Sequence, residues 1–219
     1  MNRLQAFWSS SIGKKAVMAA AGLVLAGYLI THVLANLLVF EGPARINAYA
    51  TFLHGSGGAL WGVRLVLLVA AVLHIVAAVQ LAQRKQAARP VAYAGGREHQ
   101  VSTLGARTIR WGGALILVFL VYHILHFTTG TVHPDFIPGN PYHNVAAGFR
   151  QPLVTLFYLV STAFVGLHLY HGLWSSGRSL GMSPPSPQPL HRRLSLILAL
   201  FIWLGFTAIV LGVVMGRVR

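Results

Sequence analysis

The chain has 219 residues, of which 55% are hydrophobic and only 9% are charged, too few charges for the surface of a soluble domain. The formal charge of +14 arises because only three residues are acidic, and the basic residues flank apolar segments instead of forming one nucleic-acid-binding patch. The chain contains no cysteine, which excludes disulfides, iron–sulfur clusters, thiolate ligands and covalently attached c-type haem within it.

Five apolar segments are long enough to cross the roughly 30 Å hydrocarbon core of a bilayer as helices. In chain order they cover residues 16–40, 59–82, 111–129, 152–176 and 194–216. The segments between them are basic or rich in Gly and Pro, and none of the five shows the alternation of a β-barrel strand. The sequence therefore predicts an all-α integral membrane protein with five transmembrane helices, forming one domain over residues 1–219.

Lys and Arg are distributed unevenly between the two sides of these five segments. Of the 17 Lys and Arg residues, twelve lie on the side of the N-terminus and five lie on the opposite side. Basic residues are retained preferentially in the cytoplasm. We therefore expect the N-terminus to be cytoplasmic and the C-terminus to lie outside.

Four of the predicted helices contain a histidine at membrane depth, and the four fall into two depth classes. Counting from the nearest cytoplasmic basic residue, His32 lies about 25 Å and His123 about 20 Å from the cytoplasmic edge. By the same count, His74 and His168 each lie about 15 Å from that edge. The sequence thus predicts an outer pair, His32 with His123, and an inner pair, His74 with His168.

In an up-down four-helix bundle, the first and third helices are diagonal, as are the second and fourth. Each histidine pair would then face across the interior, which fits two bis-histidine haems at different depths. Interhelical hydrogen bonds by structural histidines are the alternative. His126 and His171 each lie three residues after a pair member, and periodicity does not choose between the two positions as ligands.

Three motifs surround these histidines. They are SSIGKKAVMAAAGLVLAGYLITHVLANLLVFEGPARINAYATFLHG, LGARTIRWGGALILVFLVYHILHF and STAFVGLHLYHGLWSS. Together they resemble the cytochrome b558 family, the di-haem membrane-anchor subunits of succinate dehydrogenases and fumarate reductases. The resemblance implies that His32 and His123 ligate an outer haem b, and that His74 and His168 ligate an inner haem b. It also implies a di-haem four-helix bundle with the fifth helix, which has no histidine, at its periphery.

The resemblance further implies how the chain works in a complex of the bacterial cytoplasmic membrane. The chain would hold no dicarboxylate site. A cytoplasmic iron–sulfur subunit would dock on the basic face formed by residues 83–110 and 177–193 and connect it to a flavoprotein subunit. The two haems would relay electrons between that iron–sulfur subunit and a membrane quinone, for which we expect menaquinone.

The quinone site is expected beside the outer pair. Some family members use acidic residues there, and in the matching first outer loop this chain offers His54, which could exchange protons near neutral pH. A loop histidine that binds only water is the alternative. A second acidic position of the family, two residues before His168, is Gly166 here, which argues against a carboxylate proton route at that point.

Three other classes of protein compete with this interpretation. A transporter with histidines in a proton path would be expected to carry intramembrane carboxylates, which are absent here. The haem-b subunit of a hydrogenase or formate dehydrogenase fits the pairing and the motif of the first helix less well. The third class is a structural anchor without haem, which the absorption spectrum of the purified protein would identify.

Overall fold

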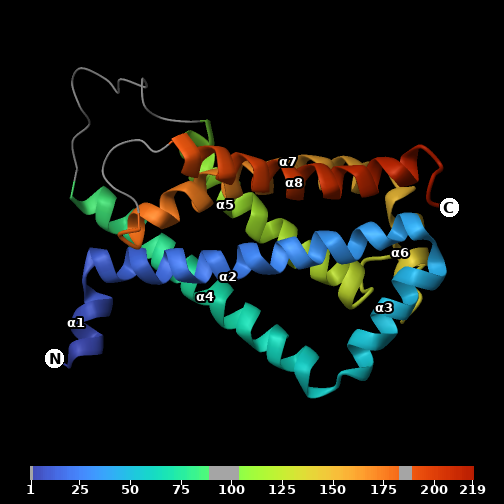
Figure 1. The fold of residues 1–219 in the computed structure, drawn as a ribbon, viewed down its shortest axis with the longest axis horizontal. Coiled ribbons are helices and arrows are strands. Elements are labelled where there is room, and N and C mark those ends of the chain that lie inside the picture. Colours follow the sequence, from blue (N-terminus) through green and yellow to red (C-terminus); the bar gives the residue numbers. More distant parts are fainter. Residues whose placement is uncertain (1, 89–103, 183–188) are drawn as a thin grey trace.

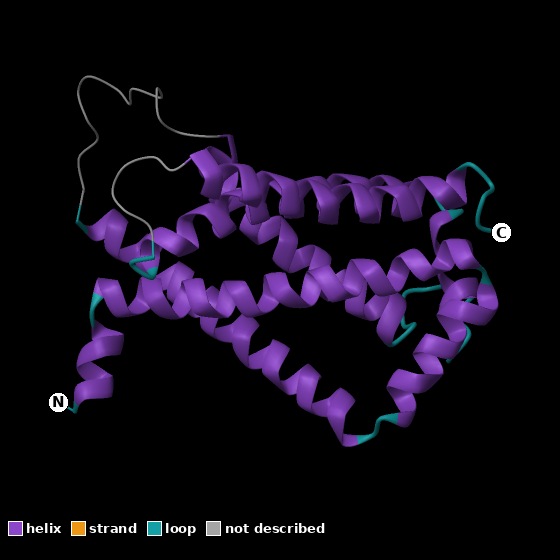
Figure 2. Ribbon diagram, in the orientation of Figure 1, coloured by secondary structure: helices purple, strands orange, loops and turns teal. Residues whose placement is uncertain are grey.

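A computed structural model describes residues 2–88, 104–182 and 189–219. In these ranges the chain forms helices joined by short loops, with no strand (Figures 1 and 2). The long helices are α2 (Ser11–Leu37), α4 (Gly58–Ala87), α5 (Leu104–His123), α7 (Pro152–Ser179) and α8 (Pro189–Val214).

Within the described residues, five helical segments are long and apolar enough to cross a membrane. They are Ser11–Glu41, Gly58–Ala87, Thr108–Thr128, Pro152–Ser179 and Leu190–Val214. Each overlaps one of the segments predicted from the sequence. The prediction of an all-helical chain with five potential membrane-spanning helices is therefore confirmed.

Shorter helical elements precede, extend or connect the long helices, and those outside the five predicted segments were not predicted. They are α1 (Arg3–Ser9), α3 (Pro43–Gly55), α6 (Pro141–Phe149), a 3₁₀ turn at Leu38–Glu41 and a π-helical turn at Ile124–Thr128. Local chemistry explains where they begin. Pro43 and Pro141 stand in the first turns of α3 and α6, where a missing backbone N–H costs nothing. Gly57, at φ +53°, makes the turn between α3 and α4.

The helix α2 lies at the centre of the packing and contacts α4, α7 and α8, while α5 packs against α7. The helix α8 packs against α7 and α2, and its Ile202 is fully buried in a core with Val33 of α2. Two glycines of α8 permit this approach. A Cβ at Gly205 would lie 2.5 Å from Val33, and one at Gly212 would lie 2.6 Å from Phe40. Many other apolar side chains of α8 are exposed, and its peripheral place beside a haem bundle stays a prediction.

By contrast, α4 and α5 form no extensive contact with each other among the described residues. In Figure 1, α4 diverges from α2 along its length, and α3 connects the separated ends. Many apolar side chains on both helices are exposed, including Leu65 and Leu68 of α4 and Val118 and Val121 of α5. The bundle is therefore closed on the side of α8 and open on the side of α4 and α5.

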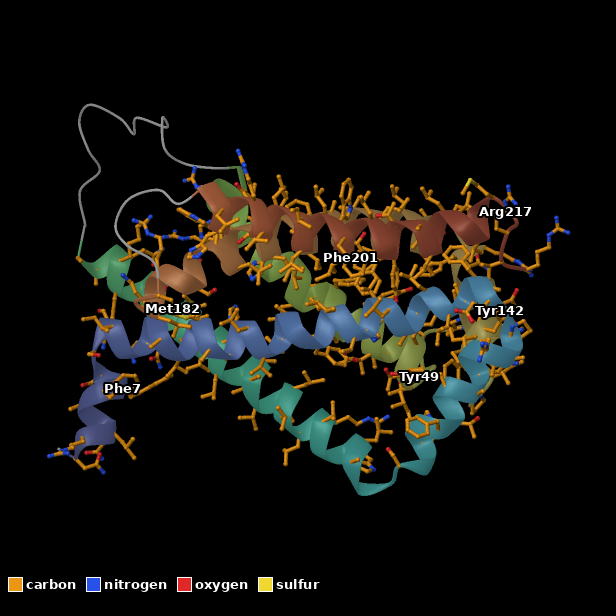
Figure 3. The ribbon with its side chains drawn as sticks, viewed as in Figure 1. Phe7, Tyr49, Tyr142, Met182, Phe201 and Arg217 are labelled. Atoms are coloured by element: carbon orange, nitrogen blue, oxygen red, sulfur yellow. The ribbon has the colours of Figure 1, made fainter. Side chains whose placement is uncertain are left out.

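Side-chain hydrogen bonds connect two of the short helices at one end of the molecule. At one end, Asn47 of α3 donates through Nδ2 to Asn140 Oδ1 over 3.0 Å, while its Oδ1 accepts the backbone N–H of Tyr142. These bonds connect α3 to α6 near the C-terminus, at the end marked by Tyr142 and Arg217 in Figure 3. Phe7 and Met182 mark the opposite end, which the sequence predicts to be cytoplasmic.

Candidate functional site

The rings of the predicted inner and outer pairs lie against each other. The ring centroids of His32 on α2 and His123 on α5 are 5.9 Å apart, with an interplanar angle of 89°. The centroids of His74 on α4 and His168 on α7 are 6.0 Å apart, at 65°. The structure thus brings together the histidines that were paired by depth, and each pair joins helices that do not follow one another in the chain.

These separations fit two imidazoles on opposite sides of one metal ion. Metal–nitrogen bonds of about 2 Å, with each ring centre about 1 Å beyond its nitrogen, place the centroids about 6 Å apart. Two rings in direct contact can have the same separation. Among the described residues no group of three or more His, Cys, Asp or Glu is placed to hold a metal ion. A pair of imidazoles would instead suit a haem, whose iron takes its protein ligands from side chains such as His.

In the inner pair, the second ring nitrogen of His74 has a fixed role. Its Nδ1 lies 2.9 Å from the carbonyl oxygen of Met18 on α2. Because a carbonyl oxygen only accepts, Nδ1 must carry the hydrogen, and the lone pair of Nε2 is left to bind a metal. His168 differs, because its buried Nδ1 has no hydrogen-bond partner in the described part of the chain.

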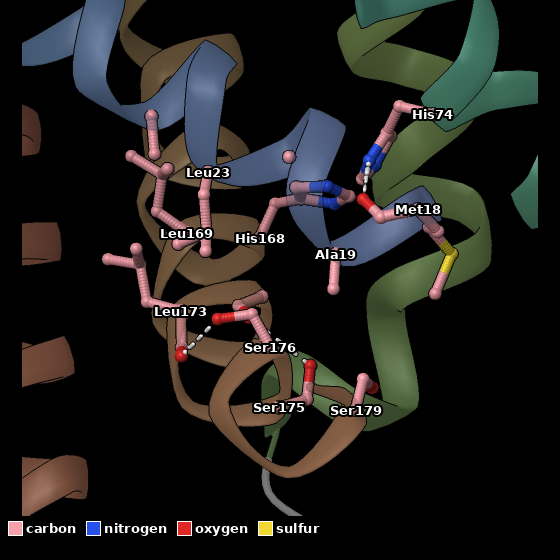
Figure 4. Close-up of a pocket in the computed structure, with 13 residues that line it drawn as sticks. Met18, Ala19, Leu23, His74, His168, Leu169, Leu173, Ser175, Ser176 and Ser179 are labelled. Atoms are coloured by element: carbon pink, nitrogen blue, oxygen red, sulfur yellow. Dashed lines mark hydrogen bonds between the residues drawn. The ribbon is translucent and has the colours of Figure 1, made fainter. Parts of the chain in front are cut away.

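A cleft surrounds the inner pair. It encloses about 460 Å³ free of protein atoms, a volume that includes open solvent, and both histidines line it. Figure 4 shows His74 and His168 projecting toward one another, with Ser175 and Ser179, near the end of α7, at one end of the cleft. Gly172 also lines the cleft and leaves space beside His168. A flat macrocycle that bridges two helices needs such small neighbours.

In the outer pair, tyrosine hydroxyls lie beside the Nδ1 atoms, as the Met18 carbonyl oxygen does in the inner pair. The Tyr28 hydroxyl lies 3.3 Å from His32 Nδ1, and the Tyr158 hydroxyl lies 3.3 Å from His123 Nδ1. Asn36 Nδ2 is also 3.4 Å from His32 Nδ1 but donates to the His32 carbonyl oxygen over 2.8 Å. A tyrosine oxygen can accept a hydrogen from Nδ1, so both outer rings can present Nε2 to a metal.

The alternative ligands occupy different surroundings. His126 is fully buried in the π-helical turn, where it stacks on Tyr122 and on His133. His171 lies beside Trp174 instead of in the ring pair formed by His168. Neither forms a ring contact with a histidine on the facing helix, which favours His123 and His168 as the ligand positions.

His54 lies apart from the paired rings. It is exposed near the end of α3, and its Nδ1 donates to the Ala50 carbonyl oxygen one turn earlier, over 2.7 Å. None of its hydrogen bonds or ring contacts in the described structure reaches His32 or His123. Its role at a quinone site therefore stays a prediction.

Gly166 has a packing role that the sequence did not reveal. A Cβ at this position would lie 3.1 Å from Trp203 Cβ, so the glycine faces α8. A carboxylate here would press against an indole instead of entering the space around His168.

Sequence reasoning did not identify three groups that contact the paired rings, namely the Met18 carbonyl, Tyr28 and Tyr158. Tyr28 could have been found, because it precedes His32 by four residues and therefore lies on the same face of the helix. The other two come from different helices. Comparison of this chain with protein-family models, curated proteins and solved structures finds no match.

Proposed function

We propose that this chain is the di-haem membrane-anchor subunit of a succinate:quinone oxidoreductase, either a succinate dehydrogenase or a fumarate reductase. His32 and His123 would ligate an outer haem b, and His74 and His168 an inner haem b. The observation that carries this proposal is the presence of two imidazole pairs with centroids 5.9 and 6.0 Å apart. A single pair would be weak support, since packed rings can have this separation.

The chain's own groups prepare each pair for ligation. Met18 holds the hydrogen of His74 on Nδ1, which keeps Nε2 free of hydrogen and fixes the ring orientation. Tyr28 and Tyr158 can do the same for His32 and His123. Bound between these rings, haem b would supply one-electron transfer between a partner's iron–sulfur cluster and a quinone.

The partner subunits would bind at the end nearest the inner pair. Arg84 and Lys85 end α4 there, and Arg178 and Arg192 lie over Trp174. Residues 89–103 and 183–188 of the predicted docking loops lie outside the described residues. We propose that an iron–sulfur subunit docks on this basic face and connects the chain to a flavoprotein that carries the dicarboxylate site.

The quinone, proposed to be menaquinone, would react near the outer pair. The open side of the bundle between α4 and α5 offers an apolar approach from the lipid. His54 remains the proposed proton-exchanging residue, because its Nδ1 is hydrogen-bonded to its own helix while the described structure gives Nε2 no hydrogen bond. The complex would lie in the bacterial cytoplasmic membrane with the N-terminus of this chain inside.

The proposal is tested by a pyridine haemochrome assay of the purified protein, which should find two non-covalent haems b per chain. A dithionite-reduced minus oxidised spectrum should show a b-type cytochrome. One haem, or none, would contradict the proposal and favour a transporter or a structural anchor. Two haems without co-purifying iron–sulfur and flavoprotein subunits that oxidise succinate would instead favour the haem subunit of another respiratory complex.

A further inference from the structure

One buried hydroxyl group lies between two histidines at the outer end of the bundle. The Tyr158 oxygen is 3.3 Å from His123 Nδ1 and 3.1 Å from His126 Nδ1. Tyr158 is 3% exposed and His126 is fully buried, so the Tyr158 hydroxyl hydrogen must find its acceptor within the protein.

The number of hydrogens available restricts the arrangement. A tyrosine hydroxyl has one hydrogen, and it lies within reach of two ring nitrogens. If His123 binds iron through Nε2, its Nδ1 carries a hydrogen and must donate it to the Tyr158 oxygen. The hydroxyl hydrogen is then free to be donated to His126 Nδ1, and His126 carries its own hydrogen on Nε2.

The described structure offers the His126 ring no hydrogen-bond partner other than Tyr158. Its Nε2 is buried without a hydrogen-bond partner among the described residues. The neighbouring ring of His133 is fully engaged, because its Nε2 donates to the Asn144 carbonyl oxygen over 2.9 Å and its Nδ1 accepts the backbone N–H of Asp135. Tyr158 is thus the only hydrogen-bond partner that the described structure gives to the His126 ring.

The position of His126 depends on two local features. The π-helical turn Ile124–Thr128 begins directly after His123 and changes the direction of the next side chains. Gly148 of α6 then leaves room for the ring, since a Cβ there would lie 2.9 Å from His126 Cε1. His126, the alternative to His123 as a ligand, is therefore held where its Nδ1 can accept a hydrogen bond from the Tyr158 hydroxyl.

We propose that Tyr158 is a positioning residue for the outer site, accepting from His123 Nδ1–H while donating to His126 Nδ1. This inference rests on the proposed function. Donation from Nδ1 makes the imidazole a stronger electron donor at Nε2, and the second bond to His126 strengthens Tyr158 as an acceptor. Such a ligand stabilises the oxidised iron and lowers the reduction potential of the outer haem.

The test is a potentiometric titration of Tyr158→Phe in the holoprotein. Loss of an outer-shell partner typically costs about 10- to 100-fold in metal affinity. We expect the ferric state to lose about 10-fold more affinity than the ferrous state, because the donor strength of His123 matters most to ferric iron. For a one-electron couple that corresponds to a positive shift of about 59 mV in the potential of the outer haem. The inner haem should keep its potential, and each haem is assigned by its loss in His123→Ala or His74→Ala.

Tyr122→Phe is the matched control, because Tyr122 stacks on His126 and contacts the Tyr158 ring while the described structure gives its hydroxyl no hydrogen bond to either. It should leave both potentials unchanged. An unchanged outer potential in Tyr158→Phe, or equal shifts of both haems, would overturn the inference.

A second variant keeps the test decisive if Tyr158→Phe loses the outer haem. His126→Phe retains the ring stacking but removes the acceptor, and it should give a smaller positive shift of the outer haem with both haems bound. No shift in this variant would also overturn the inference. A protein that binds no haem would contradict the proposed function itself, whereas two haems with insensitive potentials would contradict only the role of Tyr158.

Discussion

Gly22 of α2 lies directly against the imidazole of His74 on α4, because a Cβ at Gly22 would come within 3.1 Å of both Cε1 and Nδ1 of that ring. The same ring donates to the Met18 carbonyl oxygen, which lies one helical turn before Gly22. The absence of a side chain at Gly22 therefore allows His74 to reach the main chain of α2 and fixes the orientation of the inner pair.

Replacement of Gly22 by valine should displace His74 and remove the inner haem. A branched side chain would occupy the space of the ring, and overpacking of this kind costs about 1–3 kcal/mol. Haem content, measured by the pyridine haemochrome assay, should fall from two per chain toward one. Gly27→Val is the control on the same helix, because a Cβ there meets nothing within 4 Å, and it should keep the inner haem. Retention of both haems in Gly22→Val would show that the inner haem does not depend on this contact.

The four ligand positions make separate predictions for the two haems. His32→Ala or His123→Ala should remove mainly the outer haem, and His74→Ala or His168→Ala mainly the inner one. Loss of one of two axial ligands leaves a weakly held iron. The measurement is haem content together with the spectrum of the haem that remains.

His126→Ala and His171→Ala serve as matched controls, since each lies three residues from a ligand position but outside the ring pairs. Both should bind nearly two haems. If His126→Ala lost a haem while His123→Ala kept it, the assignment of His123 would be wrong.

The membrane-spanning segments and the pairing of the histidines could be predicted because both depend on counting residues along helices of known rise. Which helices are in contact could not be predicted in this way. The segment ending in Val214 is apolar on all sides, so hydropathy gave no face for packing, and the close approach of Gly205 to Val33 decides it. The partner of His74 was also hidden, because every residue has a carbonyl oxygen and only the fold selects that of Met18.

The helix α3 could have been recognised. Pro43 stands in its first turn and Gly57, at φ +53°, lies just past its end, which is the usual asymmetry of helix termini. Its mixed composition gives no long apolar run, and for that reason the hydropathy pattern predicts a loop here. The π-helical turn after His123 has no such sequence pattern, and it determines where His126 lies.

Introduction of a carboxylate at Gly166 should destabilise the protein instead of opening a proton route. The side chain would begin 3.1 Å from Trp203 Cβ and would bring a charge between two packed helices. We expect Gly166→Glu to lower the melting temperature of the detergent-solubilised protein. Gly113→Ala, where a Cβ meets nothing within 4 Å, should not. Trp203→Ala provides a second background for the same comparison. If Gly166→Glu left the melting temperature unchanged both in the wild-type chain and in the Trp203→Ala variant, the packing role of Gly166 would be refuted.

The predicted orientation can be tested with single cysteines, because the wild-type chain contains none. Ser9 ends α1 and Ser56 follows α3 on opposite sides of the first span, and both are exposed. In intact bacterial cells, an impermeant maleimide should label Ser56→Cys directly, and Ser9→Cys only after the membrane is permeabilised. Wild type is the unlabelled control, and the reverse labelling pattern would invert the topology.

The last prediction concerns the quinone and the side of the membrane on which it reacts. His54 Nδ1 is hydrogen-bonded to the Ala50 carbonyl oxygen, and the described structure gives Nε2 no hydrogen bond. Nε2 can therefore exchange protons while the hydrogen bond of Nδ1 to the helix is kept. Because general acid–base groups contribute about 10²–10⁴-fold, we expect His54→Ala to slow quinone turnover by at least about 100-fold. Both haem spectra, and succinate oxidation with a soluble dye as acceptor, should be unchanged in the complete complex.

His143→Ala is the control for this variant. His143 belongs to the same end of the molecule, but its Nε2 donates to the Asp135 carbonyl oxygen over 3.0 Å, so its loss should not affect quinone turnover. Normal turnover in His54→Ala would remove His54 from the mechanism and leave Tyr28, whose hydroxyl lies 3.3 Å from His32 Nδ1, as a group to examine next. A quinone-site inhibitor found between α4 and α7 near His74 would place the quinone reaction at the inner pair. The iron–sulfur subunit and the quinone would then share the cytoplasmic end, and the proposed sidedness would be wrong.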